Sequence, residues 1–156
     1  MVEKKTIRDN NLFNDLSEQE FNIVSEILKR KVYQSKETIF EEGGIDQILY
    51  IINKGEVRVG KKGPRGQIQT ITLLKEHDIY GEMSFLAGTP HSATVISTQE
   101  TEAYLLRMKD FEKLLESHPR LAFKIMKNIV ITIHSIVRGM NSRYVEMMGY
   151  MFERNR

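Results

Sequence analysis

Two short segments of the sequence carry residue types that could hold an anionic ligand. The first is Gly81-Glu82-Met83-Ser84, and the following small and apolar residues allow Met83–Leu86 to form one helical turn. The second is His91-Ser92-Ala93. Backbone N–H groups in the first turn of a helix lack intrahelical partners and favour an anion, and small side chains let a ligand approach the backbone. The Glu82 carboxylate could accept a hydrogen bond from a ligand hydroxyl.

Within residues 80–95, this arrangement resembles the phosphate-binding cassette of cyclic-nucleotide-binding domains, the family of catabolite activators and protein kinase A regulatory subunits. A second match lies upstream, where Gly43, Asp46 and Gly55 stand at the places expected in the family's glycine-punctuated strand–turn–strand. The matching segments together cover residues 17–137. The resemblance implies a single non-enzymatic regulatory domain, residues 1–156, that binds cAMP or cGMP.

The resemblance also implies a role for each cassette residue. Gly81-Glu82 would lie on the ribose side of the nucleotide, and Met83-Ser84 on the phosphate side. Ser92-Ala93 would complete the phosphate cradle. No residue is implied in catalysis or in metal binding.

One cassette position departs from the family pattern. His91 stands where the family places an arginine against the cyclic phosphate. Arginine offers a permanently charged planar fork, whereas imidazole titrates near neutral pH and offers fewer donors. A charge-assisted hydrogen bond contributes about 1.5–3 kcal/mol. We therefore expect His91 to weaken phosphate binding by roughly 10- to 1000-fold.

Three interpretations of His91 follow. The cassette could bind a cyclic nucleotide weakly, or with an affinity that rises as the imidazole gains a proton. It could instead be retuned to another small anion or nucleotide. In the third interpretation the cassette is degenerate and binds no nucleotide, and the domain acts in dimerisation or protein interaction through its C-terminal helix.

Composition limits the classes of function. A length of 156 residues with 40% hydrophobic and 28% charged residues is typical of one soluble globular domain. The formal net charge of +2 gives no strong basic field, so we expect no nucleic-acid partner. The absence of cysteine excludes disulfides and thiolate chemistry. No apolar run is long enough for a membrane span or a signal peptide, which favours a cytoplasmic protein with no membrane partner.

The elements around the cassette fall into three zones. Residues 1–31 are expected to be a helical segment, because Ser17 and Glu20 have capping-box spacing and apolar residues follow at helical intervals. Leu12 and Phe13 are expected to pack where this segment enters the domain.

Residues 32–108 read as short strands separated by glycine turns, which predicts a closed sandwich, barrel or jelly roll rather than a parallel α/β sheet. Together with the family resemblance, this implies a mainly β, α+β fold: an antiparallel β-roll or jelly roll with an N-terminal helix and C-terminal helices. The basic segment Lys61–Arg65 is interpreted as a solvated hairpin tip, with a phosphate or nucleic-acid contact as the alternative. The expected strands are Thr38–Phe40, Ile48–Ile52, Glu56–Val59, Gln67–Leu74, Ala93–Thr98 and Thr101–Arg107.

Residues 109–152 are expected to form C-terminal helices. Pro119 suits the first turn of a helix that would run from Arg120 to about Met151. Gly139 and Gly149 could bend or end this helix. Its apolar residues lie on two sides, so one side requires a partner, and we predict a homodimer through this helix. The row expected to need that partner is Phe123, Met126, Val130 and Val137.

Two rival classes are disfavoured by the sequence. A cupin-type enzyme would share the strands but needs clustered metal ligands, and the histidines at 77, 91, 118 and 134 are scattered. Transcription factors of the family append a helix-turn-helix, for which Asn141–Arg156 is too short. We therefore expect no catalysis, cofactor or bound metal.

Overall fold

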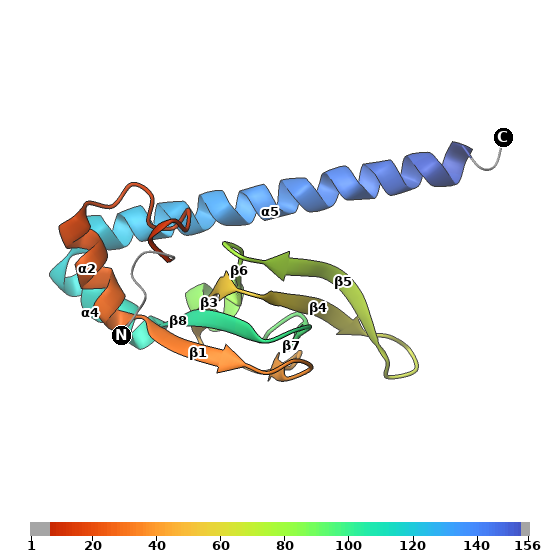
Figure 1. Ribbon diagram of the computed structural model, residues 1–156, viewed down its shortest axis with the longest axis horizontal. Helices are drawn as coiled ribbons and strands as arrows, with labels where there is room; N and C mark the ends of the chain where they lie inside the picture. The colour runs from red at the N-terminus through yellow and green to blue at the C-terminus, as the bar shows by residue number, and fades with distance from the viewer. Residues whose placement is uncertain (1–6, 154–156) are drawn as a thin grey trace.

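The computed structural model describes residues 7–153 and is drawn as a ribbon in Figure 1. Strands occupy the middle of the chain, and helices lie before, within and after them. In chain order the elements are α2 (Glu18–Ile27), β1 (Lys29–Tyr33), β2 (Thr38–Phe40), β3 (Ile48–Lys54), β4 (Glu56–Lys62), β5 (Ile68–Lys75), β6 (Ile79–Tyr80), α3 (Glu82–Ala87), β7 (Thr94–Ser97), β8 (Thr101–Arg107), α4 (Met108–Ser117) and α5 (Pro119–Glu153).

The strands form two four-stranded sheets with the orders β1-β8-β3-β6 and β2-β7-β4-β5. All the paired strands are antiparallel. The predicted β-roll with flanking helices is therefore confirmed. Consecutive strands lie in different sheets at every step except β4–β5, which pair with each other as a hairpin. In Figure 1 this hairpin lies beneath α5.

The apolar run Ile48–Ile52 is buried because β3 is covered on both faces. Leu49 and Ile51 face a cluster that contains helix residues, whereas Tyr50 and Ile52 face a second cluster between the sheets. A strand with one wet face would alternate in polarity, but a strand covered on both faces reads as a continuous apolar run. The strand therefore connects the helical layer to the interior of the roll.

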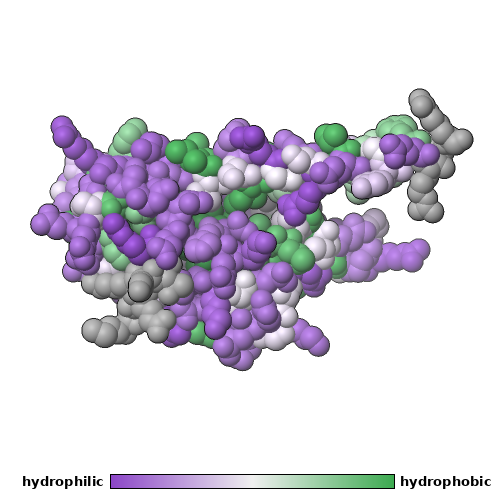
Figure 2. All heavy atoms as spheres, turned by 45° about the horizontal axis from the view of Figure 1, so that its top comes forward, coloured by the Kyte–Doolittle hydropathy of each residue, from purple (hydrophilic) through white to green (hydrophobic). Residues whose placement is uncertain are grey.

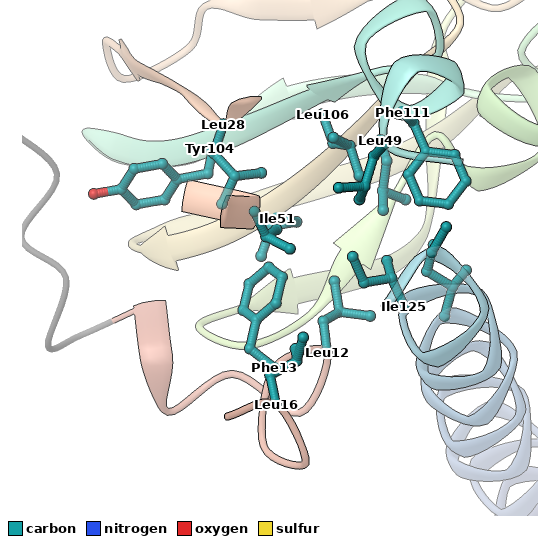
Figure 3. Close-up of a cluster of buried hydrophobic side chains, with 14 of the residues drawn as sticks. Leu12, Phe13, Leu16, Leu28, Leu49, Ile51, Tyr104, Leu106, Phe111 and Ile125 are labelled. Atoms are coloured by element: carbon teal, nitrogen blue, oxygen red, sulfur yellow. The ribbon is translucent and has the colours of Figure 1, made fainter. Parts of the chain in front are cut away.

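The larger cluster joins the N-terminal segment, the β3–β8 sheet and the helices (Figure 3). Leu12 and Phe13 are fully buried in it, as predicted. The capping box at α2 is also confirmed: Ser17 Oγ accepts from Glu20 N at 3.1 Å, and Ser17 N donates to Glu20 Oε2 at 2.8 Å. Lys124 of α5 then donates to both Glu20 carboxylate oxygens at 2.9 Å. These contacts fix the start of α5 against α2.

The carboxylates that hold α5 have lowered pKa values. The Ser17 backbone N–H, followed by the Lys124 ammonium, holds the pKa of Glu20 below its ordinary value of 4.5. Burial alone would raise the pKa of Asp15, but hydrogen bonds from Asn128 and Lys127 outweigh it and lower that pKa. Both ion pairs therefore stabilise the docked helix more strongly when the carboxyls are ionised.

The structure differs from the sequence prediction at several element boundaries and in two strands that were not predicted, β1 and β6. The helical zone expected to reach residue 31 is too long, because α2 ends at Ile27 and β1 begins at Lys29. Strand β1 is mostly exposed and charged, so its identity depends on pairing with β8 rather than on local pattern. The two-residue strand β6 was also not predicted, and it exists through pairing with Tyr50 and Ile51 of β3. Helix α4 begins at Met108, one residue before the expected boundary.

Helix α5 is 35 residues long, or roughly 50 Å at 1.5 Å per residue. Pro119 begins it, as predicted, and Gly139 and Gly149 both lie inside it without ending it. Its first half packs on the core through Leu121, Ile125 and Ile129. Its second half passes over β5, and only its C-terminal end projects past the strands (Figure 1). Of the row expected to need a partner, Phe123, Val130 and Val137 are exposed, whereas Met126 packs against the core.

Candidate functional site

A cavity of about 530 Å³ lies between residues 80–95, the β4–β5 hairpin and α5. This volume is within the range of small-molecule sites. All the residues predicted to bind ligand contribute to its wall, although they come from two separate segments. They are Gly81, Glu82, Met83, Ser84, His91, Ser92 and Ala93.

The cavity floor begins at a turn that only glycine fits. Gly81 has φ 77°, and a Cβ at this position would lie 2.8 Å from the Ile48 carbonyl oxygen. The left-handed backbone ends β6 and starts α3, and the Phe85 amide then donates to the Gly81 carbonyl. The preceding amides of the first turn have no intrahelical acceptor. They are the donors that an anion in the cavity would meet.

Ser84 contributes its backbone to the cavity more than its side chain. Its hydroxyl is buried and accepts from the Asp46 and Gln47 amides at 3.4 and 3.3 Å. Phe85 is fully buried against the Phe111 ring of α4. The short helix is therefore held from behind by the core and by the loop before β3, and its first turn keeps a fixed position.

The Glu82 carboxylate is half-buried at the start of α3. Within residues 7–153 it makes no hydrogen bond or ion pair, so its oxygens are available to accept from a ligand. Across the cavity, Ser92 is exposed and Ala93 is half-buried. The cavity thus combines an acceptor on one side with small residues on the other.

His91 is buried and tightly positioned, with its side chain only 4% exposed. Its ring stacks on Phe40, with centroids 3.6 Å apart and planes 8° apart. Its Nε2 lies 3.1 Å from Asp46 Oδ1, although the alignment is too poor for a hydrogen bond. Backbone hydrogen bonds of 2.8 Å join His91 to Gly43 and Gly44. The expected phosphate clamp therefore faces a carboxylate, and a phosphate would compete with Asp46 for the imidazole.

Asp46 organises the turn behind His91. Its Oδ1 accepts from the Ile48 amide at 3.1 Å, and its Oδ2 accepts from the Tyr50 hydroxyl at 2.7 Å. Burial, followed by this hydrogen bond, raises the pKa of the Tyr50 phenol. Tyr50 stacks on Tyr80, which lines the cavity, with ring centroids 4.9 Å apart. The glycine-punctuated motif at residues 43–55 therefore supports the cavity wall from behind.

Several wall residues were missed by the sequence analysis. Lys61, interpreted as part of a solvated tip, belongs to β4 and lines the cavity. The signal for it was the alternation of Val57, Val59 and Lys61 on one face of a strand. Helix α5 also closes the cavity, and no sequence signal identified which of its residues would do so. These are Ile133, Ile136, Val137 and Met140.

One polar contact connects α5 to the far wall. Arg143 Nη2 donates to Thr72 Oγ1 of β5 at 3.4 Å, and Thr72 lines the cavity. Within residues 7–153, no group of three or more His, Asp or Glu side chains is arranged to hold a metal ion. The same part of the chain contains no helix of the length and apolarity that a membrane span requires.

Known proteins resemble this chain in sequence. A family model described as the cyclic nucleotide-binding domain matches residues 30–118. The cyclic AMP receptor protein of Thermus thermophilus is 30% identical over 114 residues, covering 73% of this chain and 53% of that protein. The cAMP-dependent protein kinase regulatory subunit of Yarrowia lipolytica is 30% identical over 104 residues, covering 67% of this chain and 27% of that protein. The chain thus spans about half the length, or less, of these curated relatives.

Solved structures resemble it in fold. A cyclic nucleotide-binding domain from Methylobacillus flagellatus superposes with a TM-score of 0.81 at 26% identity, covering 92% of this chain and 80% of that one. The regulatory domain of Toxoplasma gondii PKA, solved with cAMP, superposes with a TM-score of 0.61 at 26% identity, covering 70% of this chain and 42% of that one.

Proposed function

The chain belongs to the cyclic nucleotide-binding domain family, and from this premise we propose that its cavity binds cAMP or cGMP as a non-enzymatic regulatory module. The observation that carries the proposal is the convergence of residues 81–84 and 91–93 on one cavity of about 530 Å³. The open amides of the α3 turn suit the cyclic phosphate. The Glu82 carboxylate, which has no partner among the described residues, suits the ribose hydroxyl.

The remaining wall suits a flat base. Apolar residues of β4 and β5 face apolar residues of α5 across the cavity, including Val59, Leu74 and Val137. Ligand pockets are generally apolar, with a few polar groups that fix orientation. A nucleotide that filled this cavity would contact the α3 turn and α5 together. Its binding would therefore alter the packing of α5, provided that the two arrangements differ in affinity.

Calorimetric titration with cAMP and with cGMP tests the proposal. We expect saturable binding that Glu82→Gln weakens by about 10-fold or more, because a hydrogen bond to a charged group is replaced by a weaker one. Glu76→Gln is the matched control, because Glu76 is exposed in the β5–β6 turn and its substitution removes the same charge at a position away from the cavity. If neither nucleotide binds at millimolar concentration, the proposal is wrong.

A second role rests on the exposed apolar surface of α5, and we propose that it mediates a homodimer. Apolar patches recur over this helix in Figure 2. Monomers rarely expose large contiguous apolar patches. The exposed apolar residues on the second half of the helix are Val137, Tyr144, Val145, Met147, Tyr150, Met151 and Phe152.

Sedimentation velocity tests the dimer. We expect a dimer at micromolar concentration, and a weaker one after Tyr144→Glu with Met147→Glu, because charge would replace apolar contact. A strict monomer at high micromolar concentration would exclude this role. If the dimer forms while neither nucleotide binds, the module acts in assembly, and nucleotide sensing is excluded.

A further inference from the structure

We propose that Lys61 supplies the phosphate-binding cation that the cassette lacks at residue 91. This inference rests on the proposed function, since it concerns the same cavity and a phosphorylated ligand. It goes further by assigning the neutralising charge to a different strand. The ammonium of β4 would then act in place of the guanidinium that the family carries beside β7.

The strand geometry directs Lys61 toward the cassette. Val57, Val59 and Lys61 alternate along β4, so their side chains share one face, and Val59 and Lys61 both line the cavity. Pairing between β4 and β7 is regular and sets Gly60 opposite Thr94. The pairing ends there, one residue before Lys61 on β4 and one residue after Ala93 of the predicted phosphate cradle, and both residues line the cavity.

The cavity wall contains one cationic side chain among the described residues, and Arg143 of α5 borders the wall only through its hydrogen bond to Thr72. Among the described residues that line the cavity, Lys61 is the only lysine or arginine, and Glu82 is the only carboxylate. An imidazolium at His91 would have its charge offset by Asp46, whose Oδ1 lies 3.1 Å away. That leaves the negative charge of Glu82 at the cavity wall, which disfavours a phosphate unless a further cation faces it. Lys61 is that cation.

The present partner of Lys61 is weakly held. Its Nζ lies 3.9 Å from Glu42 Oε1, with the two side chains 58% and 30% exposed. An exposed ion pair at this distance contributes about 0–1 kcal/mol. The ammonium is a point charge on a flexible stem, so it can leave Glu42 for a phosphate without moving the backbone. Lys61 can therefore exchange the Glu42 carboxylate for a phosphate at little cost in free energy.

The experiment compares Lys61→Met with Lys62→Met, its matched control. Lys62 is adjacent in β4 and exposed, and it does not line the cavity, so both variants change the net charge equally. Affinities for cAMP and for adenosine, which lacks the phosphate, are measured by calorimetry or competition. We expect Lys61→Met to weaken cAMP binding by about 10- to 100-fold, with adenosine binding and the thermal midpoint unchanged. Lys61→Arg should retain cAMP binding, and Lys62→Met should leave both affinities unchanged.

Each other outcome has a distinct meaning. Equal cAMP binding by Lys61→Met and Lys62→Met, with binding by the wild-type protein, would overturn this inference and leave the proposed function standing. Equal weakening of cAMP and adenosine by Lys61→Met would also overturn it, because the side chain would then shape the cavity rather than neutralise the phosphate. Absence of cAMP and cGMP binding by the wild-type protein would overturn both proposals.

Discussion

Restoring arginine at residue 91 is expected to strengthen cAMP binding by about 10- to 150-fold. A guanidinium can donate two parallel hydrogen bonds to phosphate oxygens, which a single imidazole nitrogen cannot do. A charge-assisted hydrogen bond contributes about 1.5–3 kcal/mol. Since about 1.4 kcal/mol corresponds to a tenfold change in affinity, the stated range follows from one additional bond.

The same substitution should change stability little. His91 stacks on Phe40 with centroids 3.6 Å apart, and an aromatic pair contributes about 0.5–1.5 kcal/mol. A guanidinium also stacks on aromatic faces and can pair with Asp46, so part of the loss is replaced. We expect the free energy of unfolding to fall by less than about 1.5 kcal/mol. A gain in cAMP affinity would then reflect a new contact with the phosphate rather than a change in the stability of the fold.

The assay is calorimetric titration of cAMP at pH 6 and pH 8. His118→Arg is the control, because His118 is exposed at the end of α4 and its substitution adds an arginine charge away from the cavity. Binding by the wild-type protein should strengthen at pH 6 if an imidazolium contacts the phosphate, and binding by His91→Arg should not. If His91→Arg binds no more tightly than the wild type, the phosphate does not lie beside residue 91 and the reasoning is refuted.

Three further predictions concern the fold. Gly81→Ala should destabilise the protein by about 1–3 kcal/mol in urea denaturation, because Gly81 has φ 77° and an added Cβ would lie 2.8 Å from a carbonyl oxygen. Gly149→Ala is the control and should not destabilise the protein, because a Cβ at this position of α5 meets nothing within 4 Å. Equal losses of stability in the two variants would contradict the turn geometry. Because the pKa of Glu20 is lowered from 4.5, its stabilisation of the Lys124 contact is present above pH 4.5 and is lost as the pH falls through the lower, folded-state pKa. Glu20→Gln should therefore be less stable than the wild type at pH 6 and equal to it near pH 2, and a constant difference would argue against the ion pair. Burial, followed by nearby carboxylates, raises the pKa of Tyr33 to about 12. Ultraviolet titration should therefore show a phenol transition near pH 12 that is absent in Tyr33→Phe. If the transition persists in that variant, it belongs to another tyrosine.

Local chemistry determined much of the architecture. The capping box of Ser17 and Glu20 forms as the spacing predicted, because its partners lie within one helical turn. The short strands separated by glycine turns were sufficient to predict a closed sandwich, barrel or jelly roll, and the family resemblance narrowed this to a β-roll. Strands β1 and β6 were missed because an exposed or very short strand is defined by its partner, and those partners lie far away in the sequence.

The sequence by itself also determined the cassette, since Gly81 and the short α3 helix follow from backbone preferences that depend on neighbouring residues. Only the tertiary structure decided what the cassette faces. Strand β4 brings Lys61 into the wall of the same cavity, the turn before β3 brings Asp46 against His91, and the docking of α5 closes the cavity with Met140. Each of these contacts joins residues distant in the sequence. Their geometry depends on how strands pair and helices pack, which no local pattern specifies.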